Sequence, residues 1–256
     1  MNIRILGAHN CESQTTKCIC FLIDDTLAID AGGLTSSLSI SEQQNLQAIL
    51  LTHQHYDHIR DIPGIALNLS LRRASINVYS TINVCTTIET HLLNGKVYPQ
   101  FHKLPGVKPS VCLNVIKPYE PQMVDGHEIL AIPVNHFDTT VGYQVSDSQG
   151  NKIFYTADTG PGLSDCWKHI SPQLLIIDVT LPNVYEEFAK ETGHLTPNLL
   201  KQELIILQEQ NGYLPQLIAA HMDSGLEPKI EEEIASVAEA LNISITLAQE
   251  GMLIHI

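Results

Sequence analysis

Short apolar runs that lead into a single polar residue recur along the chain. Residues 48–51 are an unbroken run of Ala, Ile and Leu, and mostly apolar runs also cover residues 128–134, 153–157 and 217–220. Such runs predict strands that are buried on both faces of a sheet. Because a histidine or an aspartate follows each run, these strands are expected to deliver polar side chains to one edge of the fold.

The segments between these runs add a strand meander and several helices. The meander is predicted from strands at residues 3–6, 19–23 and 27–29, with a turn at Asp24 and Asp25. Asp61 as a cap, with Pro63 in the first turn, predicts a helix over residues 61–69, and Thr196 with Pro197 predicts one over residues 196–211. Helices are also expected over residues 86–93 and after Glu231, Glu232 and Glu233, which lie early in the last one. Strands interleaved with helices indicate the α/β class.

No repeat, low-complexity tract or linker divides the chain, so a single domain over residues 1–256 is predicted. Residues 80–122 interrupt the regular pattern with a series of prolines after the helix predicted at 86–93. The segment is therefore expected to form a partly irregular flap that folds over the domain and shapes a pocket. The prolines are Pro99, Pro105, Pro109, Pro118 and Pro121.

Composition and charge limit the partners. With 44% hydrophobic residues, 256 residues can bury a large core, and the net charge of −14 argues against broad affinity for tRNA or DNA. A small anionic substrate remains compatible with this charge. No apolar run is long enough to span a membrane, and residues 1–7 are too short and too soon polar for a signal peptide, so a cytoplasmic location without membrane attachment is expected.

The six cysteines indicate reduced thiols rather than a disulfide framework, because they include no Cys-x-x-Cys pair. Cys11, Cys18 and Cys20 are close in sequence, and an accessory metal site is one interpretation. Alternating packing of strand side chains is the favoured one.

Residues 53–58, with the sequence His-Gln-His-Tyr-Asp-His, concentrate metal-ligating side chains at the end of the first apolar run. His53 and His55 are two positions apart in extended chain and project to the same side. Asp57 and His58 lie beyond the bend and can reach a second ion. A His-rich surface loop is the alternative, but it would not explain the buried strand that precedes the motif.

Three lone residues at the ends of the other apolar runs, His136, Asp158 and His221, can complete the ligand set. Each could instead be a hydrogen-bonded core histidine or a turn aspartate. Together with the six-residue motif they predict a metal site. Mixed nitrogen and oxygen ligands suit zinc, although manganese or iron could occupy such a site.

The order His-x-His-x-Asp-His, then His, Asp and His, resembles the metallo-β-lactamase superfamily of hydrolases over nearly the whole chain. Residues 27–33, Leu-Ala-Ile-Asp-Ala-Gly-Gly, resemble the strand and Asp-Gly segment that these proteins carry before the metal motif. The resemblance implies a four-layer α/β/β/α sandwich. The hydrophobic pattern alone indicates only the α/β class.

The resemblance also implies the ligand set of two divalent ions: His53, His55 and His136 for one ion, Asp57, His58 and His221 for the other, and Asp158 bridging them. Asp30 would orient a metal-bound histidine, as such ligands usually require. From local sequence alone, Asp30 is as readily explained as a turn residue before two glycines.

Two such ions, about 3.5 to 4 Å apart, can bridge a hydroxide, because coordination lowers the pKa of water from about 15.7 toward 7. The ions can also neutralise phosphodiester oxygens and stabilise a leaving alkoxide. Asp57, as a ligand, is therefore also a candidate catalytic residue. Lactam-cleaving relatives generally lack a bridging carboxylate and are secreted, so antibiotic hydrolysis fits poorly.

His194 is the candidate general acid. It lies in the segment Gly-His-Leu-Thr at residues 193–196, which resembles the Gly-His-x-Thr segment of phosphodiesterases of this superfamily, including tRNA 3′-processing endonucleases. Taken in isolation, His194 would be an ordinary loop histidine. His9 could line the same site, but a surface position is expected for it.

Residues 87–94 and 98–101 resemble a segment of the class II cyclic-nucleotide phosphodiesterases, which belong to this superfamily. The chain departs from that family's metal motif at Tyr56, where Leu is usual, and at Asp61, where a small residue is usual. These departures leave the substrate open and the ligands intact.

Four functions compete. The leading one is a phosphodiesterase for a small molecule, preferably a cyclic nucleotide. A tRNA 3′-processing endonuclease is disfavoured because only a predicted hairpin, turning at residues 147–151, separates His136 from Asp158 and leaves no room for the usual long arm. A glyoxalase II-like thioester or lactone hydrolase would use the same ligands. A non-enzymatic module would have eroded ligands, and none is eroded. The oligomeric state stays open, although dimers are common among similar proteins.

Overall fold

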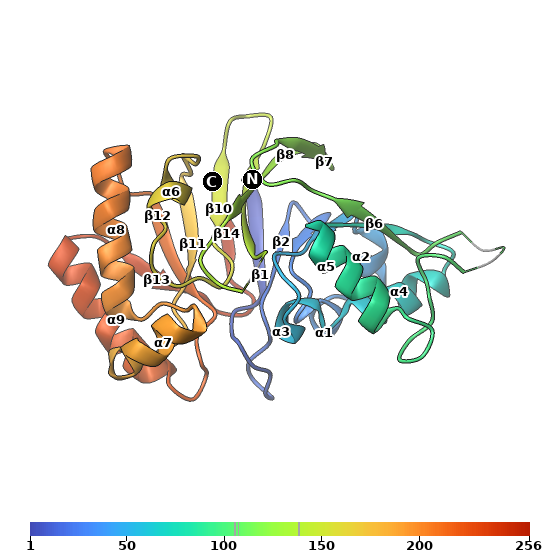
Figure 1. The fold of residues 1–256 in the computed structure, drawn as a ribbon, viewed down its shortest axis with the longest axis horizontal. Helices are drawn as coiled ribbons and strands as arrows, with labels where there is room; N and C mark the ends of the chain where they lie inside the picture. Colours follow the sequence, from blue (N-terminus) through green and yellow to red (C-terminus); the bar gives the residue numbers. More distant parts are fainter. Residues whose placement is uncertain (105, 107, 138) are drawn as a thin grey trace.

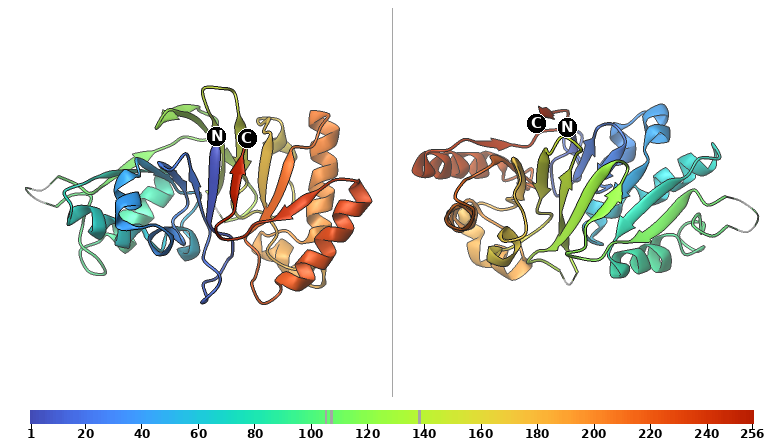
Figure 2. Two further views of the ribbon diagram at one scale, coloured as in Figure 1. Left: turned by 180° about the vertical axis from the view of Figure 1, so that it is seen from behind. Right: turned by 90° about the horizontal axis from the view of Figure 1, so that it is seen from above.

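Two mixed β-sheets pack face to face, and helices cover the outer side of each sheet (Figures 1 and 2). The computed structural model describes residues 1–104, 106, 108–137 and 139–256, and within these ranges each sheet has seven strands. The arrangement confirms the α/β/β/α sandwich. Pro105, one of the prolines of the predicted flap, lies outside the described residues.

The first sheet combines the N-terminal half of the chain with the last strand, and both termini lie on it side by side (Figure 2). Pairing is antiparallel from β14 to β3 and parallel from β3 to β6. The predicted meander with its turn at Asp24 and Asp25 is confirmed. In sheet order the strands are β14 (Leu253–His255), β1 (Asn2–Gly7), β2 (Cys20–Ile23), β3 (Leu27–Ile29), β4 (Ala48–Leu50), β5 (Ile76–Ser80) and β6 (Val111–Val115).

The second sheet repeats this scheme with the C-terminal half. Pairing is parallel from β13 to β10 and antiparallel from β10 to β7. In sheet order the strands are β13 (Ile245–Leu247), β12 (Gln216–Ala220), β11 (Leu174–Asp178), β10 (Lys152–Tyr155), β9 (Val141–Ser146), β8 (His127–Pro133) and β7 (Gln122–Val124). Four strands follow from the apolar runs, β4, β8, β10 and β12.

Helices flank the sheets on their outer faces. On the first sheet they are α1 (Leu34–Ser37), α2 (Ile40–Asn45), α3 (Tyr56–Ile59), α4 (Ile62–Ser70), α5 (Ile82–Thr87) and the π-helix η1 (Ile88–Leu92). On the second sheet they are α6 (Ser164–Trp167), the 3₁₀-helix η2 (Asn183–Tyr185), α7 (Glu186–Thr192), α8 (Pro197–Asn211) and α9 (Glu227–Leu241). In the described ranges, none of these helices has the length and apolar character needed to cross a lipid bilayer.

Local chemistry explains most helix boundaries. Thr196 caps α8 by accepting from the backbone N–H of Leu199, and Gly212 ends the helix in the left-handed conformation with φ of 76°. The predicted side-chain cap of α4 by Asp61 is wrong. The Asp61 carboxylate instead accepts from the backbone N–H of Thr35, at 2.7 Å, and so ties two helices together.

Three apolar clusters follow from the layers. The central cluster, between the sheets, includes Phe21 and Tyr155, whose rings meet edge to face at 4.8 Å between centroids. One outer cluster lies under α1 to α5 and the other under α6 to α9. Burial of each large side chain contributes roughly 1.5 to 3 kcal/mol, so the strand ends are held on a rigid frame.

The middle and the ends of the segment 80–122 lie at different places on the first sheet. Its middle part extends to the far side of the first sheet (Figure 1), where Leu93 and Phe101 are buried in the cluster under the helices. Apolar residues drive this packing, which the proline pattern did not reveal. The two ends of the segment, near Thr81 and Val115, line a pocket beside His136, at the edge where the polar residues gather.

Candidate metal centre

The polar residues gather because the strands that carry them end at the same edge. Strands β10, β11 and β12 are parallel, and β8 runs in the same direction because it is antiparallel to β9, which is antiparallel to β10. In the first sheet, β3 and β4 are likewise parallel. The carboxyl ends of parallel strands meet at one edge of a sheet, so residues far apart in sequence become neighbours there.

Backbone turns at the strand ends aim the side chains inward. Asp30, Ala157 and His221, which follow β3, β10 and β12, have φ of 58°, 60° and 67°. This left-handed conformation is unfavourable for residues other than glycine and is often retained at functional sites. At Ala157 the turn places Asp158 directly at the cluster.

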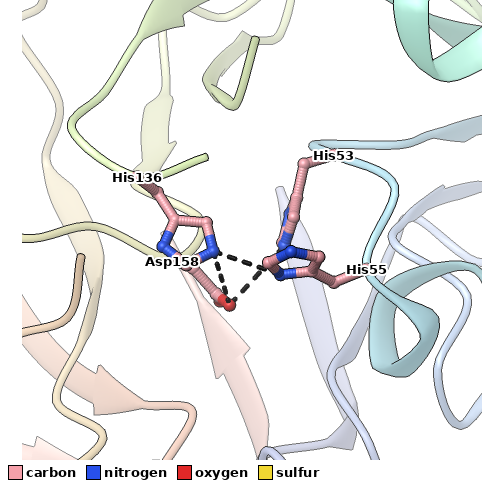
Figure 3. Close-up of side chains that lie close together, drawn as sticks. All are labelled: His53, His55, His136 and Asp158. Carbon is pink, nitrogen blue, oxygen red and sulfur yellow. Dashed lines mark hydrogen bonds and ion pairs between the residues drawn. The ribbon is translucent and has the colours of Figure 1, made fainter. Parts of the chain in front are cut away.

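One group of ligand atoms comes from His53, His55, His136 and Asp158 (Figure 3). His136 Nε2 lies 3.2 Å from His55 Nδ1 and 3.8 Å from Asp158 Oδ2, and His53 Nε2 lies 3.6 Å from the same oxygen. All four ligand atoms lie within 4.8 Å of one another. This spacing is compatible with a shared cation.

A second group comes from Asp57, His58, His221 and again Asp158. His58 Nε2 lies 3.1 Å from Asp158 Oδ1, and His221 Nε2 lies 3.1 Å from Asp57 Oδ2 and 3.3 Å from Asp158 Oδ1. The two groups therefore share Asp158 through its two different oxygens. The structure brings together all seven side chains that the motif order selects.

In most of these histidines Nδ1 donates a hydrogen bond away from the cluster, and this bond fixes the orientation of the ring. His58 Nδ1 donates to Asp30 at 2.7 Å, and His136 Nδ1 donates to the Gly193 carbonyl at 2.8 Å. His53 Nδ1 donates to the Thr52 hydroxyl at 3.0 Å. Each of these rings consequently presents Nε2 to the cluster, as a metal ligand requires.

Asp30 lies behind the cluster, fully buried, where the sequence places it. It accepts from His58 Nδ1 and from the backbone N–H of Thr52 at 2.8 Å. The Thr52 hydroxyl donates to the same carboxylate at 2.9 Å and links it to His53. Asp30 thus orients two rings, one of them through Thr52, a residue that the sequence analysis missed.

Asp178 is a second buried carboxylate of this kind, and the sequence analysis missed it. Its Oδ1 accepts from the Thr180 hydroxyl at 2.7 Å and lies 3.2 Å from His221 Nδ1 and 3.3 Å from His194 Nδ1. Thr180 also accepts from His221 Nδ1 at 2.8 Å. The signal existed, because residues 174–177 are another apolar run that leads into an aspartate.

Substituting Asp178 with Asn is expected to weaken metal affinity and turnover by 10- to 100-fold each, as is usual when a partner of a metal-bound histidine is lost. Asparagine lacks the negative charge that faces the two imidazoles, and its NH2 group cannot accept from the backbone N–H of Leu195 as Oδ2 does at 2.8 Å. Isothermal titration with zinc and steady-state turnover measure the two losses. Unchanged values for both would show that Asp178 only supports the fold.

The imidazole and carboxylate groups of the cluster are chemically suited to hold a metal ion. Three buried atoms that face the cluster, His53 Nε2, His58 Nε2 and Asp158 Oδ1, form no well-aligned hydrogen bond among the described residues, although the last two lie 3.1 Å apart. A buried polar atom without a partner costs about 1 to 3 kcal/mol. Imidazole nitrogens and carboxylate oxygens that converge without hydrogen bonds are the groups that satisfy zinc or a similar divalent ion.

The electrostatics of the cluster point the same way. Burial lowers the pKa of His58, but the carboxylates of Asp158, Asp30 and Asp57 outweigh burial and raise it well above its ordinary value. Burial likewise opposes protonation of His221, yet Asp158, Asp178 and Asp57 raise its pKa to about 10. The carboxylates therefore create a negative potential that favours a bound cation.

A pocket of about 490 Å³ opens onto the second group and is lined by Asp57, Asp158, His194 and His221. Arg60 stands at the same pocket, ion-paired with Glu12. His194 lines this pocket, and its Nδ1 faces away from it toward Asp178 and Thr180.

The expectation of a surface position for His9 is wrong, since its ring is buried between Glu250 and Glu227.

The three cysteines that are close in sequence do not belong to the cluster of ligands. Cys18 and Cys20 are buried and Cys11 is exposed, and the groups of metal-ligating side chains found among the described residues contain none of them. Cys20 donates to the carbonyl of Asp30 at 3.2 Å. Alternating packing holds for Cys20, which lies in β2 and in the outer cluster, whereas Cys18 precedes the strand and lines the pocket at the second group.

Gly193 is required by close packing at the cluster. Its φ is 73°, and a Cβ at this position would lie 2.9 Å from Nδ1 and 3.0 Å from Cα of His136. The Gly193 carbonyl can thus approach and hold His136 only because no side chain intervenes.

This sandwich, with histidines and aspartates gathered at one edge, defines the class of metal-dependent hydrolases with a metallo-β-lactamase fold. The family described as the beta-lactamase superfamily domain matches residues 27–222, so the chain belongs to this family. The resemblance drawn from the motif order is confirmed.

Two curated proteins are similar in sequence. A 3′,5′-cyclic-nucleotide phosphodiesterase of Aliivibrio fischeri is 23% identical over 227 residues, which cover 72% of this chain and 67% of that protein. A hydroxyacylglutathione hydrolase of Psychromonas ingrahamii is 33% identical over 106 residues, which cover 37% of this chain and 36% of that protein. The second likeness therefore concerns little more than a third of either protein.

Solved structures extend the likeness in fold. Unliganded yeast PDE1 superposes with a TM-score of 0.83 at 16% identity, covering 100% of this chain and 99% of that chain. The short form of human tRNase Z superposes with a TM-score of 0.70 at 20% identity, again covering 100% and 99%. At these identities the likeness establishes the fold.

Proposed function

We propose that the protein is a binuclear metal-dependent phosphodiesterase that hydrolyses a small phosphodiester, with a cyclic nucleotide as the preferred substrate. The sequence similarity to a cyclic-nucleotide phosphodiesterase over 72% of the chain supports this proposal. The similarity in fold to yeast PDE1 is compatible with it. The observation that carries it lies in the site, where His194 and Asp178 stand beside the clustered ligands.

The seven clustered side chains would hold the metal ions: His53, His55 and His136 for one, Asp57, His58 and His221 for the other, and Asp158 for both. Zinc fits these ligands, and manganese or iron would also be accepted. Bound divalent ions would supply an activated water and neutralise charge on the phosphate. Asp30 and Asp178 keep the imidazoles of His58 and His221 turned so that Nε2 of each faces Asp158 in the cluster.

His194 is suited to move a proton to the leaving group. Its Nδ1 is engaged by Asp178 and Thr180, at 3.3 and 3.1 Å, so Nε2 is the atom left to hold a proton toward the pocket. Burial raises the pKa of the Asp178 carboxyl, but His194 and His221 outweigh burial and lower it, so Asp178 stays ionised. In this arrangement His194 would be the general acid, and Asp178 would hold its ring in position.

A positioned acid favours phosphodiester over thioester hydrolysis. A thiolate leaves readily, because the pKa of a thiol is about 8.5. An alkoxide from a sugar hydroxyl is far more basic and needs a proton as it departs. A positioned acid at His194 would be superfluous in a glyoxalase II-like enzyme, whereas Asp178 would still orient His221 there.

A substrate panel tests the proposed function. Purified protein loaded with zinc or manganese is assayed with bis(p-nitrophenyl) phosphate, 2′,3′- and 3′,5′-cyclic nucleotides, a glutathione thioester and a tRNA precursor. We expect turnover of the phosphodiesters, with a cyclic nucleotide giving the highest kcat/KM. Activity confined to the thioester would refute the proposal, and activity confined to the tRNA precursor would establish the nuclease instead.

A further inference from the structure

A second cavity of about 490 Å³ adjoins the cluster, and His136 is the ligand residue that lines it. One wall comes from the start of α5 and the end of β6, including Ile82 and Val115. The opposite wall comes from the facing ends of β8 and β9, including Val134 and Val141. We call this cavity the apolar groove. Its volume lies within the range of about 300 to 1,000 Å³ that is usual for small-molecule sites.

The groove contains a polar atom that the fold does not use. Thr81 is only 7% exposed, and its hydroxyl has no hydrogen-bond partner among the described residues. Thr81 occupies the N-cap position of α5, where a threonine hydroxyl normally accepts from the helix, but it makes no such bond. An unpartnered buried hydroxyl is costly, so a ligand atom that reaches the groove would gain a hydrogen bond there.

His136 connects the groove to the cluster. Its Nε2 lies 3.2 Å from His55 Nδ1, while the residue also borders the groove together with Phe137. Phe137 is 53% exposed, and its ring lies 5.4 Å from the His55 ring, measured between centroids. A substrate that reacts at the cluster and extends past His136 therefore enters the groove alongside an aromatic face.

We propose that the apolar groove binds the nucleobase of a nucleotide whose phosphodiester is hydrolysed at the cluster, an inference that rests on the proposed function. A nucleobase has apolar faces and polar edges. Its faces can lie between the wall with Ile82 and Val115 and the wall with Val134 and Val141, next to Phe137. Its edge can bond the Thr81 hydroxyl and the exposed amide of Asn83, which also lines the groove. An acyl chain would leave the Thr81 hydroxyl unpaired.

Two variants test the groove, each with a matched control. Val115→Trp fills the groove, and Leu71→Trp places the same ring on an exposed site at the end of α4, outside the groove. Thr81→Val removes the hydroxyl at nearly constant volume, and Thr86→Val does so at an exposed position of α5. The substrates are one purine and one pyrimidine 3′,5′-cyclic nucleotide and methyl p-nitrophenyl phosphate, which has no base.

We expect Val115→Trp to lower kcat/KM for the cyclic nucleotides at least tenfold and to leave methyl p-nitrophenyl phosphate within twofold of the unmodified protein. Loss of one hydrogen bond in Thr81→Val should lower kcat/KM for the nucleotides by roughly three- to tenfold. Both control variants should match the unmodified protein. Equal losses for the nucleotides and the base-free diester would overturn the groove assignment while leaving the proposed function intact.

Binding gives a readout that does not depend on turnover. In saturation-transfer NMR with adenosine 5′-monophosphate, we expect the base protons to be saturated by the unmodified protein and by Leu71→Trp but not by Val115→Trp. Ribose 5-phosphate should bind all three equally. Base protons that receive saturation equally from all three proteins would refute the groove assignment. Absence of any phosphodiester turnover would refute the proposed function, and the NMR result would still decide the groove.

Discussion

Replacing Asp158 with asparagine is expected to lower turnover by roughly three orders of magnitude and to reduce bound metal from two ions per chain to one or fewer. Both carboxylate oxygens face the cluster, Oδ1 at 3.1 Å from His58 Nε2 and Oδ2 at 3.6 Å from His53 Nε2. An amide offers one oxygen and no negative charge. Metal ions contribute several kcal/mol to the stabilisation of a transition state, and each 1.36 kcal/mol is about tenfold in rate.

Elemental analysis and turnover of bis(p-nitrophenyl) phosphate measure this effect. Asp165→Asn is the matched control, because the Asp165 side chain is 86% exposed on α6, outside the cluster. It should retain full activity and metal. Asp158→Asn protein that is folded by circular dichroism, binds two ions and turns over normally would contradict the role of Asp158 as a shared ligand.

Replacing His194 with alanine is expected to lower turnover of a cyclic nucleotide by two to four orders of magnitude while metal content stays unchanged. Acid catalysis by a positioned side chain typically contributes this much. His194 bonds to Asp178 and Thr180 and is absent from the two groups of ligand atoms that share Asp158. Its loss should therefore abolish proton donation to the leaving group without releasing the metal ions.

Comparing substrates with different leaving groups distinguishes a general acid from a histidine that only supports the structure. p-Nitrophenolate is a weak base that departs without a proton, so His194→Ala should impair bis(p-nitrophenyl) phosphate far less than a cyclic nucleotide. His91→Ala, at an exposed position of η1, is the control and should affect neither substrate. An equal loss for both substrates, or a loss of metal, would remove the acid role.

Much of the fold could be predicted because its central strands are buried on both faces. Residues 48–51 and 217–220 contain no polar residue and are too short to form a stable helix. The hydrophobic pattern therefore predicts the strands β4 and β12. The outer segments were less predictable. Leu93 and Phe101 pack under the helices of the first sheet, a long-range contact that prolines nearby cannot indicate.

The candidate ligands could be predicted because metal-binding residues come in restricted types and in a fixed order along the chain. The residues behind them could not. Thr52 and Thr180 are ordinary threonines until the fold places their hydroxyls between an aspartate and a histidine. Thr81 is likewise unremarkable in sequence, since only the structure reveals that its buried hydroxyl makes no helix cap.

The central claim is that seven side chains hold two divalent ions that share Asp158. Anomalous diffraction from crystals grown with zinc or manganese tests it most directly. We expect two peaks per chain, one among His53, His55 and His136 and one among Asp57, His58 and His221, with Asp158 contacting both. A single peak, peaks at other places, or no peak in protein that is folded and saturated with metal would contradict the account.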